Sequence, residues 1–136
     1  MGANRCVLDS GALTALAEKD DGIRRYIERA IQEKAEIVVP TVVIAETTTG
    51  TPRDASLNRL LAAFGPTLVV LTESLARDAG SLRYRAHRPV RDTIDAIVVA
   101  TADAVSGSTI LTGDIGDLGA LASVRGRSAV LSLEDA

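Results

Sequence analysis

The sequence predicts one α/β domain, residues 1–136, with a largely parallel sheet covered by helices. Short β-branched runs alternate with amphipathic helical segments, and no repeat, low-complexity segment or domain linker interrupts them. Such alternation is typical of a parallel sheet, because parallel strands need crossover helices. Only 2% of the residues are aromatic, so the core must consist of Val, Ile, Leu and Ala packed between layers.

Turn and capping signals divide the chain into elements. Ser10 is a candidate cap for the first helix, and Thr51 with Pro52 supplies a cap and a first helical position further along. The segment 41–50 has helical spacing but β-branched composition, and we expect a helix that Gly50 ends. In order, we expect strand 5–9, helix 10–20, helix 21–34, strand 35–40, helix 41–50, helix 52–64, strand 67–71, helix 72–87, helix 92–106, strand 108–112, a loop or short helix over 113–122, and strand 128–133.

The spacing of apolar residues separates the helices from the strands. Within 21–34, Ile23, Ile27 and Ile31 recur at helical spacing opposite Arg and Glu, which predicts an amphipathic helix. The strand segments are instead short and rich in Val, Ile and Leu. The helix over 72–87 must end before proline, because the residue ahead of a proline avoids the helical region.

Composition and charge exclude several classes of protein. We find no secretion signal, since an acid follows the first short apolar run, and no apolar run approaches the ~18 residues of a membrane span. Cys6 has no partner for an internal disulfide and fits a strand core in a reducing compartment. We therefore expect a cytoplasmic protein without membrane contact. The net charge of −3 argues against binding nucleic acid through bulk electrostatics.

Four acidic residues follow or cap the ends of predicted strands. Asp9 closes the first strand, Asp114 follows the strand 108–112, Glu46 lies in the helix after the second strand, and Asp95 lies in the first turn of the long helix. In open α/β sheets, ligands bind outside the carboxyl ends of the strands. Four carboxylates meeting there would repel by roughly 3 kcal/mol per pair at ~5 Å, so the crevice needs a cation or protonated carboxyls.

Each acid also has a purely structural interpretation. Asp9 can cap the first helix, Asp114 can initiate a turn, and Glu46 can face solvent. Asp92 can cap the long helix, with Asp95 completing its first turn. Asp95 is the hardest to explain in this way, because its helix is too apolar to present a broad solvated face.

The residue types present limit the choice of cation. One His and one Cys cannot build a zinc site, whereas a set of carboxylate oxygens suits Mg²⁺ or Mn²⁺. Mg²⁺ keeps several waters and binds phosphates, so the first hypothesis is hydrolysis of a phosphodiester by a metal-activated water.

Four segments carry a resemblance to a known family. They are "VLDSGAL" from residue 7, "VVPTVVIAET" from 38, "DTIDAIVVATA" from 92 and "ILTGDIGDL" from 110. In order and spacing they resemble the PIN domain, and more narrowly the VapC-type toxin ribonucleases of bacterial toxin–antitoxin pairs. The resemblance covers essentially the whole chain.

The resemblance implies a three-layer α/β/α fold with a five-stranded parallel sheet in the order 3-2-1-4-5. It also implies an endoribonuclease that depends on Mg²⁺ or Mn²⁺, a homodimer, and a cognate antitoxin that blocks the site. Its catalytic acids fall on Asp9, Glu46, Asp95 and Asp114, of which Asp9, Asp95 and Asp114 would hold the metal. Asp92 and Asp117 match acids that some members use to hold waters or a second metal.

The segment 83–91, "RYRAHRPVR", is a candidate guide for RNA. It offers four arginines, Tyr84 for stacking on a base, and His87. A solvated helix face followed by a polar loop explains the same residues equally well. His87 is better explained as a loop residue than as a general base, since a carboxylate and metal site does not require one.

Other enzyme classes fit the sequence less well. A haloacid-dehalogenase-like phosphotransferase would need an acid at position 11, which is Gly, and no phosphate-binding P-loop motif is present. A receiver domain would need a lysine after its fourth strand, but the lysines are Lys19 and Lys34. The alternative that remains is a catalytically silent PIN-like module that acts through a protein partner.

Overall fold

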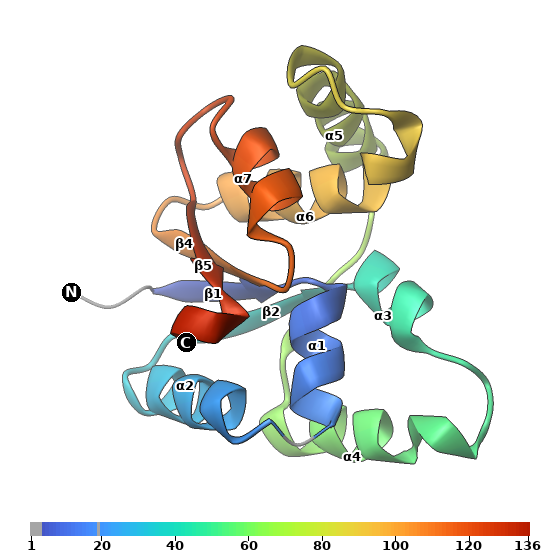
Figure 1. The fold of residues 1–136 in the computed structure, drawn as a ribbon, viewed down its shortest axis with the longest axis vertical. Helices are drawn as coiled ribbons and strands as arrows, with labels where there is room; N and C mark the ends of the chain where they lie inside the picture. Colours follow the sequence, from blue (N-terminus) through green and yellow to red (C-terminus); the bar gives the residue numbers. More distant parts are fainter. Residues whose placement is uncertain (1–3, 19) are drawn as a thin grey trace.

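The computed structural model describes residues 4–18 and 20–136 (Figure 1). Residues 1–3 and 19, which fall in the expected domain and in the expected helix 10–20, lie outside the described residues. The helices and strands, in order, are β1 (Arg5–Leu8), α1 (Ser10–Ala17), α2 (Asp21–Gln32), β2 (Glu36–Pro40), α3 (Thr41–Thr47), η1 (Pro52–Asp54), α4 (Ala55–Phe64), β3 (Thr67–Val69), α5 (Glu73–Arg85), η2 (Val90–Asp92), α6 (Thr93–Asp103), β4 (Ser108–Thr112), α7 (Ile115–Ala122), β5 (Ala129–Ser132) and η3 (Leu133–Asp135), where η marks a 3₁₀ helix.

The five strands form one parallel sheet in the order β3-β2-β1-β4-β5, which confirms the predicted order. The central strand β1 pairs with β2 on one side and with β4 on the other, and Leu8 lies opposite Leu111. The chain therefore runs outward from β1 through β2 to β3, and then crosses to β4 and β5 on the other side of β1. The carboxyl ends of β1 and β4 lie side by side at this reversal, where a ligand site is expected.

Helices cover both faces of the sheet and complete the three-layer arrangement (Figure 1). Helices α1, α2 and α4 lie on one face, and α5, α6 and α7 lie on the other. The core between the layers is aliphatic, and Leu8, Val38 and Ile110 of the sheet are fully or almost fully buried. In α6 every residue from Ala96 to Asp103 is buried. Among residues 4–18 and 20–136, no helix combines the length and apolar character that a membrane crossing requires.

Some boundaries differ from the predicted ones. Asp9, and not Ser10, caps α1, because its carboxylate accepts the Ala12 amide at 2.8 Å. Helix α3 ends at Thr47 rather than at Gly50, since Thr48 is already extended. A 3₁₀ turn precedes α4 and another precedes α6, so both α-helices start later than predicted. The segment 113–122, where the sequence predicts a loop or short helix, contains helix α7.

The start of α1 and the turn after β4 approach closely. A Cβ placed on Gly11 would lie 3.2 Å from both the Cα and the amide nitrogen of Gly113. Both neighbouring atoms belong to the backbone, so they cannot move aside by a side-chain rotation. The glycine pair therefore allows the backbones that follow β1 and β4 to lie side by side at the carboxyl edge of the sheet.

We predict that Gly11→Ala lowers the free energy of unfolding by about 1–2 kcal/mol, because the added methyl group overpacks two backbone segments. Urea denaturation monitored by circular dichroism measures this change. Gly80→Ala is the matched control, since Gly80 is interior to α5 and a Cβ there meets nothing within 4 Å. It should raise the stability by about 0.5–1 kcal/mol through helix propensity. A Gly11→Ala protein as stable as the unsubstituted one would contradict the close-approach argument.

Candidate active site

Asp9 lies at the end of β1, where the sequence predicted a site residue. The residue is 5% exposed, and both carboxylate oxygens accept hydrogen bonds. Oδ1 accepts the Ala12 amide at 2.8 Å, and Oδ2 accepts the Thr112 hydroxyl at 2.5 Å. Burial raises the pKa of Asp9, which the hydrogen bonds from Thr112 and from the backbone partly oppose, while the nearby charge of Asp114 raises it further.

Asp114 follows β4 and lies beside Asp9. Its amide donates to the Thr112 hydroxyl at 2.8 Å, so Thr112 links the two acids through one side chain. The Asp114 carboxylate also accepts the Asp117 amide at 3.2 Å and caps α7. The strand end and the helix start therefore fix the position of Asp114 together.

Asp95 lies in the first turn of α6, near four other carboxylates. Burial raises its pKa to about 6, and repulsion by Asp9, Asp92, Glu46 and Asp117 adds to the rise. These repelling carboxylates come from the end of β1, from η2, from α3 and from α7. The site therefore forms where separate parts of the chain converge on Asp95.

Glu46 lies on α3 and is exposed, as is Asp114, whereas Asp9 is buried and Asp95 is partly buried. Its carboxylate accepts a hydrogen bond from the Ser10 hydroxyl at the start of α1. Ser10 therefore orients Glu46, a role that the capping interpretation of Ser10 missed. Glu46 also contributes to the charge that raises the pKa of Asp95, so the two carboxylates lie near each other.

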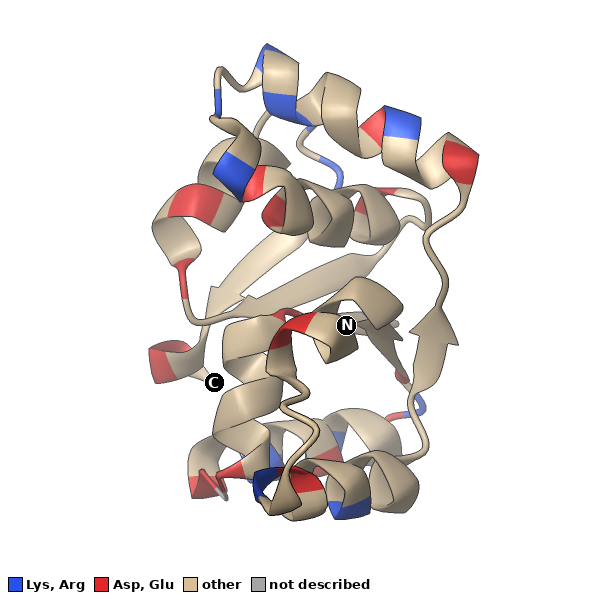
Figure 2. Cartoon of the chain, turned by 90° about the vertical axis from the view of Figure 1, so that its right-hand side faces the viewer, with Lys and Arg blue, Asp and Glu red and all other residues tan. Residues whose placement is uncertain are grey.

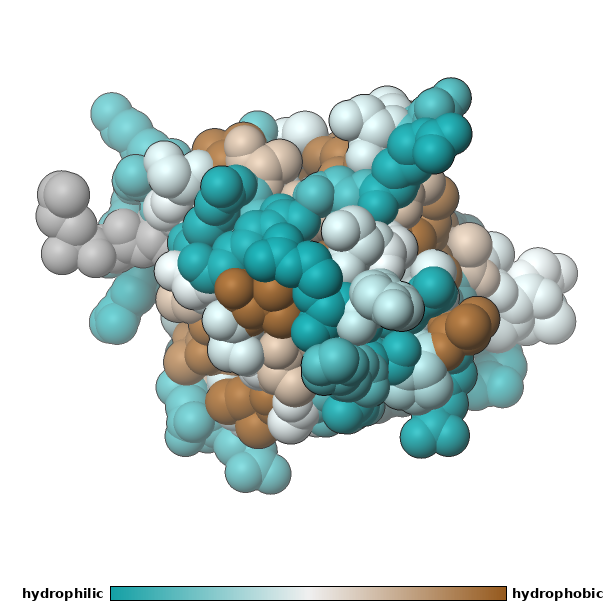
Figure 3. All heavy atoms as spheres, turned by 90° about the horizontal axis from the view of Figure 1, so that it is seen from above, coloured by the Kyte–Doolittle hydropathy of each residue, from teal (hydrophilic) through white to brown (hydrophobic). Residues whose placement is uncertain are grey.

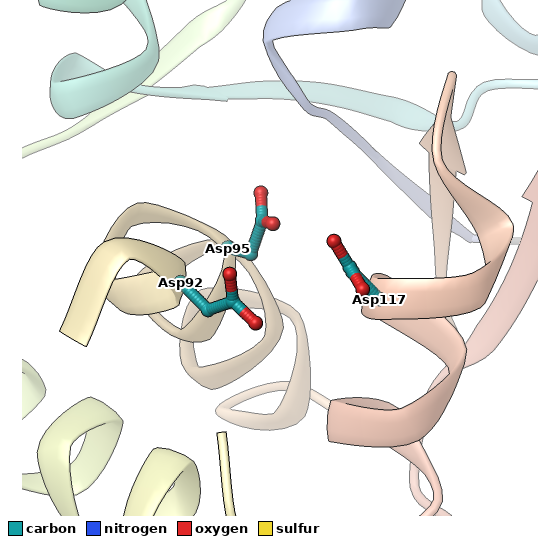
Figure 4. Close-up of side chains that lie close together, drawn as sticks. All are labelled: Asp92, Asp95 and Asp117. Carbon is teal, nitrogen blue, oxygen red and sulfur yellow. The ribbon is translucent and has the colours of Figure 1, made fainter. Parts of the chain in front are cut away.

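The tightest acidic group consists of Asp92, Asp95 and Asp117 (Figure 4). Each residue offers one carboxylate oxygen, and these three oxygens all lie within 4.8 Å of one another. Figure 4 shows Asp92 and Asp95 at the start of the α6 segment, with Asp117 reaching toward them from α7. Of the predicted metal ligands Asp9, Asp95 and Asp114, only Asp95 belongs to this group.

Arg88 bridges two members of this group. Its Nε donates to Asp92 at 2.8 Å, and its Nη2 forms an ion pair with Asp117. The hydrogen bond to Asp92 raises the pKa of Arg88, so its guanidinium is permanently charged. Asp92 is 5% exposed, and it makes no side-chain cap bond to α6. Pairing with Arg88 replaces the capping role that the sequence suggested for Asp92.

Sequence reasoning missed Arg88 as a partner of the acids. The spacing of Arg88 and Asp92, four residues apart next to a helix start, is a local signal that could have found one of the two pairs. Asp117 is 29 residues from Arg88, so that contact depends on how α7 packs.

The donors in this crevice suit a hard divalent cation. They are carboxylate oxygens supplied by several elements, and a carboxylate with a raised pKa, such as Asp95, gains most from a nearby positive charge. Capping does not compete with such a role, because a carboxylate has about four acceptor positions. Asp9 uses two of them within the chain.

The side chains of the segment 83–91, the candidate RNA guide, differ in orientation: some contact other residues and others are exposed. Arg88 faces the acids, and Arg83 donates to the Thr93 hydroxyl at 2.6 Å. Arg85 and Arg91 are exposed, and Tyr84 is 80% exposed. Figure 2 shows arginine-bearing segments on the α5 side, next to the acidic segments of α6 and α7. The face seen from above is largely hydrophilic, with scattered hydrophobic patches (Figure 3).

We predict that Asp95→Asn stabilises the metal-free protein at neutral pH and not at acidic pH. Because folding raises the pKa of Asp95 from 3.8 to about 6, the folded state binds the proton more tightly than the unfolded state. This contribution to stability is complete below pH 3.8 and is lost as the pH rises through about 6. The rise corresponds to at most about 3 kcal/mol, which screening by water at this partly exposed group reduces to about 1 kcal/mol.

Chemical denaturation with a chelator present, at pH 4.5 and pH 8, measures this difference between Asp95→Asn and the unsubstituted protein. Asp135→Asn, at an exposed position in η3, is the control and should show no such pH dependence. An Asp95→Asn protein that is less stable than the unsubstituted protein at pH 8 would mean that the carboxylate stabilises the start of α6.

Comparison with known proteins identifies the family to which this fold belongs. A family model described as the PIN domain matches residues 6–121. No curated protein matches the sequence. Among solved structures, the chain is similar to VapBC2 from Rickettsia felis bound to a DNA fragment from their promoter, with 14% identity, 94% of this chain and 98% of the other covered, and a TM-score of 0.72.

Two further solved structures show the same fold. One is a toxin–antitoxin complex from Klebsiella pneumoniae, with 17% identity, coverage of 94% and 97%, and a TM-score of 0.69. The other is DNA-bound VapBC from Salmonella typhimurium, with 16% identity, coverage of 95% and 98%, and a TM-score of 0.65. The PIN match covers most of the residues, including Asp9, Glu46, Asp95 and Asp114, and the chain therefore belongs to the PIN domain family, a family of nucleases.

Proposed function

We propose that this protein is a metal-dependent endoribonuclease that hydrolyses RNA phosphodiester bonds. The observation that carries the proposal is the convergence of acids from β1, α3, η2 and α7 on Asp95, whose pKa rises to about 6 as a result of burial and of their charge. Carboxylates held so close together are costly unless a cation joins them. Membership in the PIN domain family supports nuclease chemistry at this position.

Asp9, Asp95 and Asp114 would hold Mg²⁺ or Mn²⁺. When bound, this ion supplies a Lewis acid for a phosphate oxygen and a source of activated water. Thr112 fixes Asp9 and Asp114 relative to each other through its hydroxyl. Glu46, which is oriented by Ser10, would orient the attacking water and accept its proton.

The exposed side chains beside the acids would receive the RNA. Tyr84 can stack on a base, and Arg85 and Arg91 can pair with phosphates. These groups act locally, so the net charge of −3 is no obstacle. A single-stranded substrate fits this arrangement, because its unstacked bases are available to an aromatic side chain.

We further propose that the protein is the toxin of a toxin–antitoxin pair and a homodimer. The three structures named above are VapBC or toxin–antitoxin complexes. In each of them, one chain is similar to this protein over nearly its whole length. These complexes support an antitoxin partner for this chain, which would block the acidic site. The proposed RNA substrate also fits the cytoplasmic location expected from the sequence.

We predict that Asp9→Asn lowers metal-dependent RNA cleavage by at least about 100-fold. Even substitution of residues that only hydrogen-bond to metal ligands often lowers metal affinity or activity about 10- to 100-fold. The measurement is cleavage of a labelled RNA by purified protein with Mg²⁺ or Mn²⁺. Asparagine keeps an oxygen to accept the Ala12 amide, so the helix cap and the circular dichroism spectrum should persist. Asp135→Asn is the matched control and should cleave normally.

Cleavage that survives a chelator, or that Asp9→Asn retains, would contradict the proposed enzyme. A folded protein that cleaves no RNA under any of these conditions would instead favour the catalytically silent module that acts through a partner.

We also predict that a small DNA-binding protein encoded next to this one forms a stable complex with it and suppresses the cleavage. Size-exclusion chromatography with light scattering measures the complex and the mass of the free protein, which should be that of a dimer. The absence of such a neighbour would contradict the toxin assignment while leaving the nuclease proposal in place.

A further inference from the structure

The position of Arg88 follows from a sharp turn of the chain after α5. His87 adopts a left-handed conformation with φ of 57°, and its amide donates to the Tyr84 carbonyl at 3.0 Å. The Arg88 amide then donates to the Arg83 carbonyl at 3.0 Å. Non-glycine residues adopt this conformation only occasionally, and here it turns the following residue back toward the crevice.

The Arg88 guanidinium lies between two carboxylates that belong to different elements. One is Asp92 at the end of η2, and the other is Asp117 on α7. Each carboxylate gives one oxygen to the guanidinium: Asp92 Oδ2 to Nε and Asp117 Oδ1 to Nη2. The Arg88 side chain is only 28% exposed. These ion pairs are therefore partly buried rather than fully solvated.

The same two carboxylates form, with Asp95, the group whose oxygens lie within 4.8 Å of one another. A divalent ion could use such a group, but the guanidinium already engages two of its three members. The resident positive charge also offsets part of the negative charge that would attract a second ion. Asp9 and Asp114 have no ion pair with an arginine or lysine among the described residues.

We propose that Arg88 is a positioning residue that takes the place of a second divalent ion between Asp92 and Asp117, and so restricts the acidic crevice to one metal ion. This inference rests on the proposed function for the first ion. It assigns the two sets of acids different tasks. Asp9, Asp95 and Asp114 are left for the metal, while Asp92 and Asp117 hold the α6 and α7 sides together through Arg88.

Neighbouring arginines do not share this role. Arg83 donates to Thr93, and Arg85 lies exposed on the last turn of α5. Arg85→Gln is therefore a matched control, because it removes the same charge three residues away without touching the acids.

The test counts Mn²⁺ ions bound per chain at neutral pH, by titration with free Mn²⁺ followed by electron paramagnetic resonance. The unsubstituted protein and Arg85→Gln should each bind one ion, and Arg88→Gln should bind two. Arg88→Met, which keeps the aliphatic stem, should also bind two. Arg88→Lys, which retains a cation, should bind one, and Asp92→Asn added to Arg88→Gln should return the count to one.

Folding of each variant is checked by circular dichroism, and Arg88→Met replaces Arg88→Gln if the latter does not fold. Two ions on the unsubstituted protein, or an unchanged count in folded Arg88→Gln and Arg88→Met, would overturn the proposal. Absence of binding in every variant would overturn it together with the metal-dependent function. One ion on the unsubstituted protein and two on Arg88→Gln, without RNA cleavage by either, would support the role of Arg88 and contradict only the proposed nuclease.

Discussion

The mutual repulsion of carboxylates at the carboxyl edge of the sheet is the constraint on which the rest of the structure depends. Because β1 and β4 are parallel neighbours, Asp9 and the turn that carries Asp114 must lie side by side. Helix α6 adds Asp95 to the same crevice. Within the protein, hydrogen bonds from Thr112 and from backbone amides offset part of the repulsion, and Arg88 offsets another part. The remaining negative charge is what makes a divalent cation the expected ligand.

The packing of α6 and of the segments after β1 and β4 keeps the acidic side chains close together despite their repulsion. The buried length of α6 anchors Asp95 to the core, so the carboxylate cannot escape by moving its helix. The contact between Gly11 and Gly113 holds the backbones after β1 and β4 together. Both features limit how far the acidic side chains can move apart when no cation is bound.

Local features of the fold were predictable from the sequence, and features that depend on tertiary packing were not. Alternating strands and helices follow from apolar spacing, and the positions of Asp9 and Asp114 follow from strand ends; the strand order came from the family resemblance. The sequence offered both Ser10 and Asp9 as caps for α1, because both residue types are good caps, and the structure assigns the cap to Asp9. The bridge from Arg88 to Asp117 could not be foreseen, since it spans 29 residues and depends on the seating of α7.

Capping and chemistry coexist in the same carboxylates because each has more acceptor positions than the fold consumes. Asp9 accepts one bond from a helix amide and one from Thr112, and Asp114 accepts one from the Asp117 amide. These bonds fix where each carboxylate lies, while the remaining lone pairs stay available to a ligand. An amide side chain would reproduce the cap but not the charge. Stability and function at these positions therefore respond to different properties of the same group, its oxygen for the helix and its negative charge for the cation.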